Sequence, residues 1–165
     1  MERDAVTMRL NLEGLPPSTQ PASTILVRPV VRDDLPSLGR VMHRAYRGTV
    51  DDEGETELDA IGELEGTIDG KYGEFNWEAS LVAEVDDVPV SSSLVTSWRG
   101  FPLLAFTVTL PEWQGRGIGN RLICQSAELL GAQGFHELRL VVTRTNPAVH
   151  LYRKVGFLEY DAGPR

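Results

Sequence analysis

A glycine-rich segment separates two strongly patterned stretches of this sequence. Residues 103–110 form an almost unbroken apolar and β-branched run, which predicts a central strand buried on both faces. Apolar residues recur at helical spacing over residues 118–130. Between them lies Gln114-Gly115-Arg116-Gly117-Ile118-Gly119. Glycines let the backbone approach a ligand, and a helix N-terminus offers free N–H groups with partial positive charge. The segment therefore predicts a phosphate or pyrophosphate site, to which Arg116 and Arg121 could add charge-assisted contacts.

Two well-known phosphate-binding motifs do not fit this segment. A dinucleotide-binding G-x-G-x-x-G would need glycine at position 120 or 122, where the chain has Asn120 and Leu122. The P-loop pattern needs a terminal G-K-[ST], and the segment has none. What remains is Q-x-x-G-x-G at the start of a helix. The alternative is a glycine-rich turn that serves packing alone.

A second motif lies downstream, from Asn146 to Phe157, and reads Asn-Pro-Ala-Val-His-Leu-Tyr-Arg-Lys-Val-Gly-Phe. Together the two segments resemble the acyl-CoA pyrophosphate loop and the N-x-x-A-x-x-x-Y-x-x-x-G-F motif of the GNAT superfamily of acyl-CoA N-acyltransferases. Asn146, Tyr152 and the Gly156-Phe157 pair fall at the motif's positions, whereas the alanine, Ala148, comes early. The resemblance covers roughly residues 24–160.

The resemblance implies a fold, a co-substrate and a set of binding residues. The expected fold is α/β, with a central mixed sheet flanked by about four helices and splayed open where the acyl-CoA inserts. Acetyl-CoA is the expected co-substrate, and no metal is expected. The residues expected to bind acetyl-CoA are Thr107, Val108, Thr109, Leu110, Gln114, Gly115, Arg116, Gly117, Ile118, Gly119, Asn120, Arg121, Asn146 and Tyr152.

The same resemblance assigns catalytic roles. Tyr152 is the expected general acid for the CoA thiolate, with Asn146 in support, and backbone N–H groups of residues 107–110 are candidate oxyanion donors. The general base stays open, because the run 103–110 contains no acidic residue. Glu112 and the acidic segment from Asp51 to Glu55 are the candidates. The three histidines, His43, His136 and His150, are interpreted as structural or solvated.

These residues favour an N-acetyltransferase that moves an acetyl group from acetyl-CoA to a primary amine of a small molecule or peptide by direct attack. The alternative is a non-catalytic acyl-CoA-binding sensor or regulatory module. An amine panel discriminates the two, because a sensor would bind the cofactor without turnover.

The composition of the chain limits which classes of partner we expect it to bind. The net charge of −8 argues against nucleic acid and suits a cationic amine. The single cysteine, Cys124, excludes an intrachain disulfide. No stretch approaches the ~20 apolar residues of a membrane span, and no signal-peptide pattern begins the sequence. We therefore expect a cytoplasmic protein without a membrane partner.

The pattern predicts one domain over residues 24–165, preceded by an N-terminal extension over residues 1–23. Gly14, Pro16, Pro17 and Pro21 interrupt any regular structure in that extension. Members of the family carry a further strand after the Gly156-Phe157 strand, but only a few residues follow Tyr160. That strand is expected to be missing, supplied differently or borrowed from a partner chain, which leaves a homodimer open.

Overall fold

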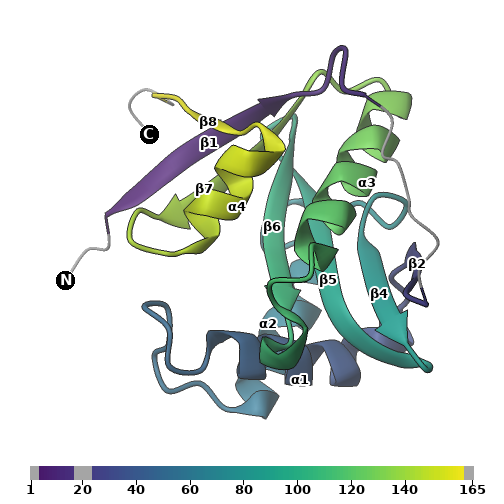
Figure 1. The fold of residues 1–165 in the computed structure, drawn as a ribbon, viewed down its shortest axis with the longest axis vertical. Coiled ribbons are helices and arrows are strands. Elements are labelled where there is room, and N and C mark those ends of the chain that lie inside the picture. Colours follow the sequence, from purple (N-terminus) through teal and green to yellow (C-terminus); the bar gives the residue numbers. More distant parts are fainter. Residues whose placement is uncertain (1–3, 17–23, 162–165) are drawn as a thin grey trace.

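The computed structural model describes residues 4–16 and 24–161, which form a single mixed sheet with helices on both faces (Figure 1). The strands are β1 (Ala5–Asn11), β2 (Leu26–Pro29), β3 (Glu74–Phe75), β4 (Leu81–Val85), β5 (Val88–Trp98), β6 (Phe101–Thr109), β7 (Glu137–Thr143) and β8 (Leu158–Glu159). The helices are α1 (Leu35–Tyr46), α2 (Glu57–Ile68), α3 (Ile118–Ala132) and α4 (Ala148–Val155). Short 3₁₀ turns at Arg32–Asp34 and Pro111–Trp113 precede α1 and α3. The predicted fold class is confirmed.

The sheet opens between β6 and β7, near its middle. Its order is β2-β4-β5-β6-β7-β1-β8, with β3 paired to β5. Every pair is antiparallel except β6–β7, which is parallel and is joined through a single partner pair, Leu103 and Arg139. Beyond that pair the two strands run apart, as Figure 1 shows. A bulge accompanies the opening: Leu94 pairs with Phe106 and Val95 with Leu104, so Ala105 is the extra residue on β6.

The first strand corrects the predicted N-terminal extension. Residues 5–11 form β1, which inserts between β7 and β8 and pairs with β7 along its whole length. Its side chains alternate, with Val6, Met8 and Leu10 buried and Thr7 and Arg9 on the other face. Treating residues 1–23 as an appendage was therefore wrong for β1. The remaining residues of that range, 1–3 and 17–23, lie outside the described residues. The strand that lies beside β8 is thus β1, from the N-terminal side of the chain.

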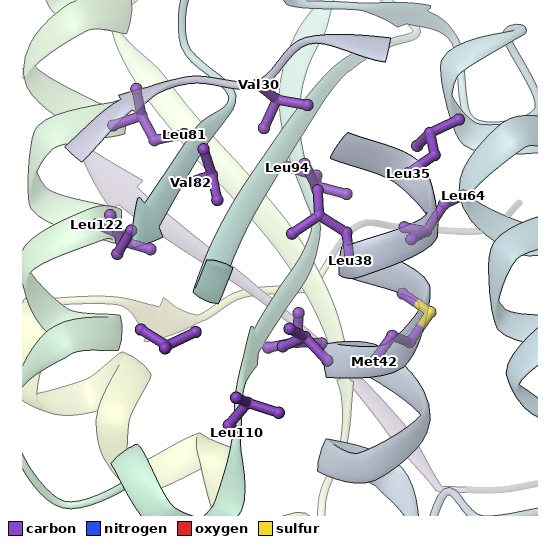
Figure 2. Close-up of a cluster of buried hydrophobic side chains, with 14 of the residues drawn as sticks. Val30, Leu35, Leu38, Met42, Leu64, Leu81, Val82, Leu94, Leu110 and Leu122 are labelled. Carbon is purple, nitrogen blue, oxygen red and sulfur yellow. The ribbon is translucent and has the colours of Figure 1, made fainter. Parts of the chain in front are cut away.

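Two apolar clusters form the core. One packs α1, α2 and the N-terminal part of α3 against β4, β5 and β6, and Figure 2 shows Leu38, Leu94 and Leu122 among its side chains. The other packs α3 and α4 against β7 and β1, around Met8 and Phe157. Fully burying one such side chain contributes about 1.5–3 kcal/mol. The clusters fix both helical layers around the opening in the sheet.

The strand buried on both faces is β5, not β6 as the sequence predicted. Residues 89–96 of β5 are all buried, whereas Leu103, Ala105, Phe106 and Thr107 of β6 are only half-buried. The reason is the opening itself: β7 turns away after Leu103, so one edge of β6 borders a cavity instead of another strand.

Candidate functional site

The glycine loop has the backbone that a ligand-binding turn needs. Gly115 and Gly117 have φ angles of +76° and +79°, the left-handed region that favours glycine. A Cβ built on either would meet no atom within 4 Å, so the space above the first turn of α3 is open. Gly119 differs: it is buried, and a Cβ there would lie 3.3 Å from Leu151 Cδ2. Gly115 and Gly117 shape the loop, and Gly119 lets α3 pack closely.

The first turn of α3 presents a favourable field for an anion. Gly117 is its N-cap residue, and its first turn contains no acidic side chain. Arg116 stacks with its guanidinium 4.5 Å from the centroid of the Trp113 ring. Gln114 Nε2 donates a 3.0 Å hydrogen bond to the Thr109 carbonyl oxygen, which ties the loop to the end of β6. This geometry suits a diphosphate.

Several other residues that were expected to bind the co-substrate have side chains or N–H groups that point into the protein. The side chains of Val108 and Ile118 are buried in the core, so only their backbone groups can serve a ligand. Leu110 N–H donates to the Val90 carbonyl oxygen at 2.9 Å, which commits that candidate oxyanion donor to β5. Asn120 Oδ1 accepts from Cys124 Sγ at 3.4 Å, within α3.

A cavity of about 560 Å³ lies beside the opening between β6 and β7. Its wall combines α1, the loop before α2, α2 itself, β6, β7 and the region from Asn146 to Tyr152. Six carboxylates line it, and we call it the acidic cavity: Asp51, Asp52, Glu53, Glu55, Asp59 and Glu63. The acidic segment predicted from the sequence thus shares one cavity with Asn146 and Tyr152.

Asp51 joins distant parts of the chain at this cavity. Its carboxylate accepts a 2.7 Å hydrogen bond from Asn146 Nδ2 and a 3.0 Å hydrogen bond from Thr143 Oγ1. Asn146 Oδ1 in turn accepts from the Ala148 backbone N–H at 2.9 Å, at the start of α4. The Thr143 hydroxyl and the fixed Asn146 amide, both neutral donors, hold the carboxylate beside the β6–β7 opening.

Tyr152 has the properties of a proton donor. Its side chain is 9% exposed and packs edge-on against Phe157, with ring centroids 5.8 Å apart. Burial raises the pKa of Tyr152 to about 12; the nearby Thr107 hydroxyl offsets part of the rise, and the Asp51 charge adds to it. The Thr107 contact is weaker than a full hydrogen bond, because Oγ1 of Thr107 has no partner of good geometry among the described residues. Near neutral pH the Tyr152 hydroxyl therefore keeps its proton.

Sequence reasoning did not single out four further residues that line the acidic cavity, Tyr46, Glu63, Lys71 and Tyr72. Tyr46 is half-buried, and burial together with nearby Tyr152 and Asp51 raises its pKa. Glu63 accepts a 2.7 Å hydrogen bond from Lys71 Nζ and another from the Tyr72 hydroxyl. Burial alone would raise the pKa of Glu63, but these two hydrogen bonds lower it below its usual value. Tyr46 lay on the apolar face of the α1 pattern, where it could not be told from a core residue.

Glu112 lies outside the acidic cavity. Its carboxylate accepts two 2.8 Å hydrogen bonds from Arg44, in a separate hollow that Trp113 also lines. Among the histidines, only His43 lines the acidic cavity. His136 pairs with Glu13 at 2.8 Å, and His150 is exposed on α4. The structure therefore separates the two predicted sources of a base and brings the Asp51 segment alone to Tyr152.

The described residues contain neither a metal-binding cluster nor a membrane-spanning helix. No group of three or more His, Cys, Asp or Glu side chains in residues 4–16 and 24–161 could hold a metal ion. No helix in the same part of the chain is long and apolar enough to cross a bilayer.

Comparison with solved structures shows the fold. A GCN5-related N-acetyltransferase from Sphaerobacter thermophilus has a TM-score of 0.73 and 22% identity, over 96% of this chain and 49% of that one. The PaiA N-acetyltransferase from Thermoplasma acidophilum, solved with coenzyme A, has a TM-score of 0.69 and 22% identity over 83% of this chain and 91% of that one. A GNAT family acetyltransferase from Brucella melitensis, solved with acetyl-CoA, has a TM-score of 0.64 and 21% identity over 85% and 89% of the two chains.

Comparison of sequences shows the family. A mycothiol acetyltransferase from Arthrobacter sp. (strain FB24) is 42% identical over 53 residues, which are 32% of this chain and 16% of that protein. This chain thus spans only a small part of that relative and about half of the Sphaerobacter chain. The family model for the acetyltransferase (GNAT) domain matches residues 76–159, just over half of the sequence. The chain therefore belongs to the GNAT family of acetyltransferase domains.

Proposed function

We propose that this domain transfers an acetyl group from acetyl-CoA to a primary amine of a small molecule or peptide. The observation that carries the proposal is the meeting of Asp51, Asn146 and Tyr152 in one acidic cavity beside the β6–β7 opening. The glycine loop follows the C-terminal end of β6, and the hydrogen bond from Gln114 to the Thr109 carbonyl oxygen holds it there. A site for a diphosphate and a site for an amine thus border the same opening.

Residues of the glycine loop fit the co-substrate's charged end. The open space at Gly115 and Gly117 leaves room for a diphosphate against the N–H groups of the first turn of α3. Arg116 and Arg121 add positive charge there. The thioester arm would follow Thr107–Thr109 on the open edge of β6, whose backbone groups would polarise the carbonyl.

The acidic cavity supplies the proton chemistry. An ammonium group must lose a proton before its nitrogen can attack, since a free alkylamine has a pKa near ~10. We assign that proton to the Asp51 carboxylate, directly or through one water. The amine nitrogen then bonds to the acetyl carbon, and the carbon–sulfur bond breaks. The leaving thiolate takes the hydroxyl proton of Tyr152, and the excess proton on the acylated nitrogen passes to the Tyr152 phenolate, directly or through one water. Asn146 positions Asp51 through its 2.7 Å hydrogen bond.

Two measurements test the proposal in sequence. Calorimetric titration with acetyl-CoA, with NAD and ATP as controls, should show selective micromolar binding. Release of free CoA thiol in the presence of a panel of primary amines should then show turnover. Binding without turnover of any amine would favour the acyl-CoA sensor, and no binding by folded protein would exclude both functions.

A matched pair of variants tests the base. Asp51→Asn should lower kcat by about 10²-fold, the usual scale for one general base. Glu112→Gln makes the same change of charge outside the acidic cavity and should leave kcat within about twofold. Equal effects of the two substitutions would remove Asp51 from its assigned role.

A further inference from the structure

A second cavity of about 510 Å³ continues from the acidic cavity. Tyr72, Ala105, Phe106 and Val141 line both, so the two are contiguous over β6 and β7. Beyond these shared residues the wall changes character. We call this part the aromatic cavity, after Trp98, Phe101 and Tyr160, which line it together with Arg99 and Arg139.

The charges of the two cavities are opposite. Six carboxylates against Arg47 and Lys71 make the acidic cavity strongly negative. The described wall of the aromatic cavity contains two arginines and no carboxylate. Arg139 Nε and Nη2 donate hydrogen bonds of 3.2 and 3.1 Å to the Glu137 carboxylate. These bonds hold the guanidinium in place and offset part of its positive charge. Arg99 adds a cation at the rim. One long ligand therefore meets a negative field at one end and a positive one at the other.

Flat surfaces flank the two arginines. The Arg139 guanidinium lies 3.4 Å from the centroid of the Phe101 ring and 5.2 Å from that of Tyr160. Arg99 lies 5.6 Å from the centroid of the Trp98 ring, whose side chain remains 43% exposed. Val141, at 52% exposed, faces the passage between the cavities. Exposed apolar and planar groups beside a cation suit a planar group that carries a negative charge.

We propose that the acceptor is a zwitterion with its charges far apart: an amine at one end, and an aromatic group bearing a carboxylate at the other. This proposal rests on the proposed acetyl transfer, because it places the amine beside Asp51 and Tyr152. The body of the acceptor then crosses Val141 and Phe106, and its carboxylate reaches Arg99 and Arg139. A tetrapeptide with an aromatic C-terminal residue has this chemistry and this length, because Arg139 and Thr143, which contacts Asp51, are four residues or about 13 Å apart along β7.

Three peptide probes separate the contribution of the aromatic ring from that of the carboxylate. Triglycyl-phenylalanine carries the amine, the ring and the carboxylate; its C-terminal amide lacks the negative charge; tetraglycine lacks the ring. Initial rates of acetylation should give triglycyl-phenylalanine a kcat/KM at least tenfold above that of either other probe. The difference should lie mainly in KM, since the distal contacts form equally before and during transfer.

Variants of Arg99 and Arg139 test whether these two residues cause the preference for the carboxylate over the amide. Arg99→Asn suits the left-handed backbone at this position, where φ is +52°, and Arg139→Gln keeps a long polar side chain. Either should reduce the preference for triglycyl-phenylalanine over its amide to less than threefold. Arg32→Gln, at an exposed site outside both cavities, should preserve it. A preference that is absent in the parent protein, or unchanged in both arginine variants, overturns the proposal.

Equilibrium binding of the same probes to protein saturated with CoA separates this proposal from the proposed function. Suppose no probe is acetylated, yet triglycyl-phenylalanine binds at least tenfold more tightly than its amide and loses that advantage in Arg99→Asn. The aromatic cavity then stands as a binding site and acetyl transfer fails. Acetylation of all three probes with equal efficiency has the opposite meaning: the transfer stands and the zwitterion is wrong.

Discussion

Asn146 donates a 2.7 Å hydrogen bond from its side chain to Asp51, a residue 95 positions earlier in the chain. The bond fastens the loop that follows α1 to the turn that precedes α4. Both segments border the acidic cavity, and Tyr152 lies one helical turn further along α4 than Ala148. The bond therefore fixes where the Asp51 carboxylate lies relative to the Tyr152 side chain.

The pair should act as one unit in catalysis. Asp51→Ala and Asn146→Ala should each lower kcat by at least about tenfold, and the double variant should be little worse than Asp51→Ala alone. The same cycle on Arg44 and Glu112, which form a well-aligned exposed pair elsewhere, is the control and should leave kcat unchanged. Strictly additive losses at Asp51 and Asn146 would show that the two act separately.

Substitution in the glycine loop should abolish binding of acetyl-CoA. Gly117→Trp places a large ring in the open space above α3 and also strains a backbone with φ of +79°. Affinity should fall by more than tenfold in a calorimetric titration. Gly131→Trp, at an exposed and equally open position near the other end of α3, should bind like the parent. Gly117→Asn tolerates the left-handed backbone and separates strain from occlusion.

Removal of the Tyr152 hydroxyl should affect turnover and not binding. Tyr152→Phe keeps the ring against Phe157 and removes the proton that the thiolate needs. We expect kcat to fall by about 10²-fold while the Kd for acetyl-CoA changes by less than threefold. Parent-like turnover in a folded variant would mean that water or another group protonates the thiolate.

Burial of the same hydroxyl predicts a loss of stability in alkali. The pKa of Tyr152 is about 12 in the folded protein, above the value near ~10 of an unfolded tyrosine. The folded state therefore resists deprotonation, so this contribution is complete below pH 10 and is lost as the pH rises toward 12. Linkage gives about 2–3 kcal/mol over that range. Urea unfolding at pH 9 and pH 11.5 should show a smaller decline for Tyr152→Phe than for Tyr160→Phe; equal declines would contradict it.

The strand β1 should be an integral part of the domain. Met8 is fully buried between the sheet and α3, and Met8→Ala should cost about 2–5 kcal/mol of unfolding free energy. Arg9→Ala, at the next position and on the exposed face of β1, should cost less than about 1 kcal/mol. Denaturant titration of both variants decides whether residues 5–11 belong to the core.

Local signals carried most of the sequence prediction. The strand at 81–85 has the predicted bounds, because Asp86 and Asp87 adopt the positive φ angles of a tight hairpin turn. The glycines at 115 and 117 likewise report a backbone conformation that only the local chain decides. In such places one segment determines its own structure.

Contacts between segments that are distant in the chain could not be predicted from the sequence. The alternation of Val6, Met8 and Leu10 is short and is followed by Gly14 and Pro16, so nothing nearby indicates that β7 will be its partner. The role of Asp51 depends on Thr143 and Asn146, which only the folded sheet brings close. Half-burial of β6 follows from the opening beside it, which hydrophobicity alone does not report.

The position of β1 also constrains how this domain folds during synthesis. Ala5–Asn11 leaves the ribosome first of all the strands, but both of its neighbours, β7 and β8, are made last. Until they emerge, Val6, Met8 and Leu10 have no apolar surface to cover, and an unpaired strand of this kind can associate with other chains. The sheet can close only after nearly the whole domain has been translated, which makes the slowest contact of the fold the one between its two ends.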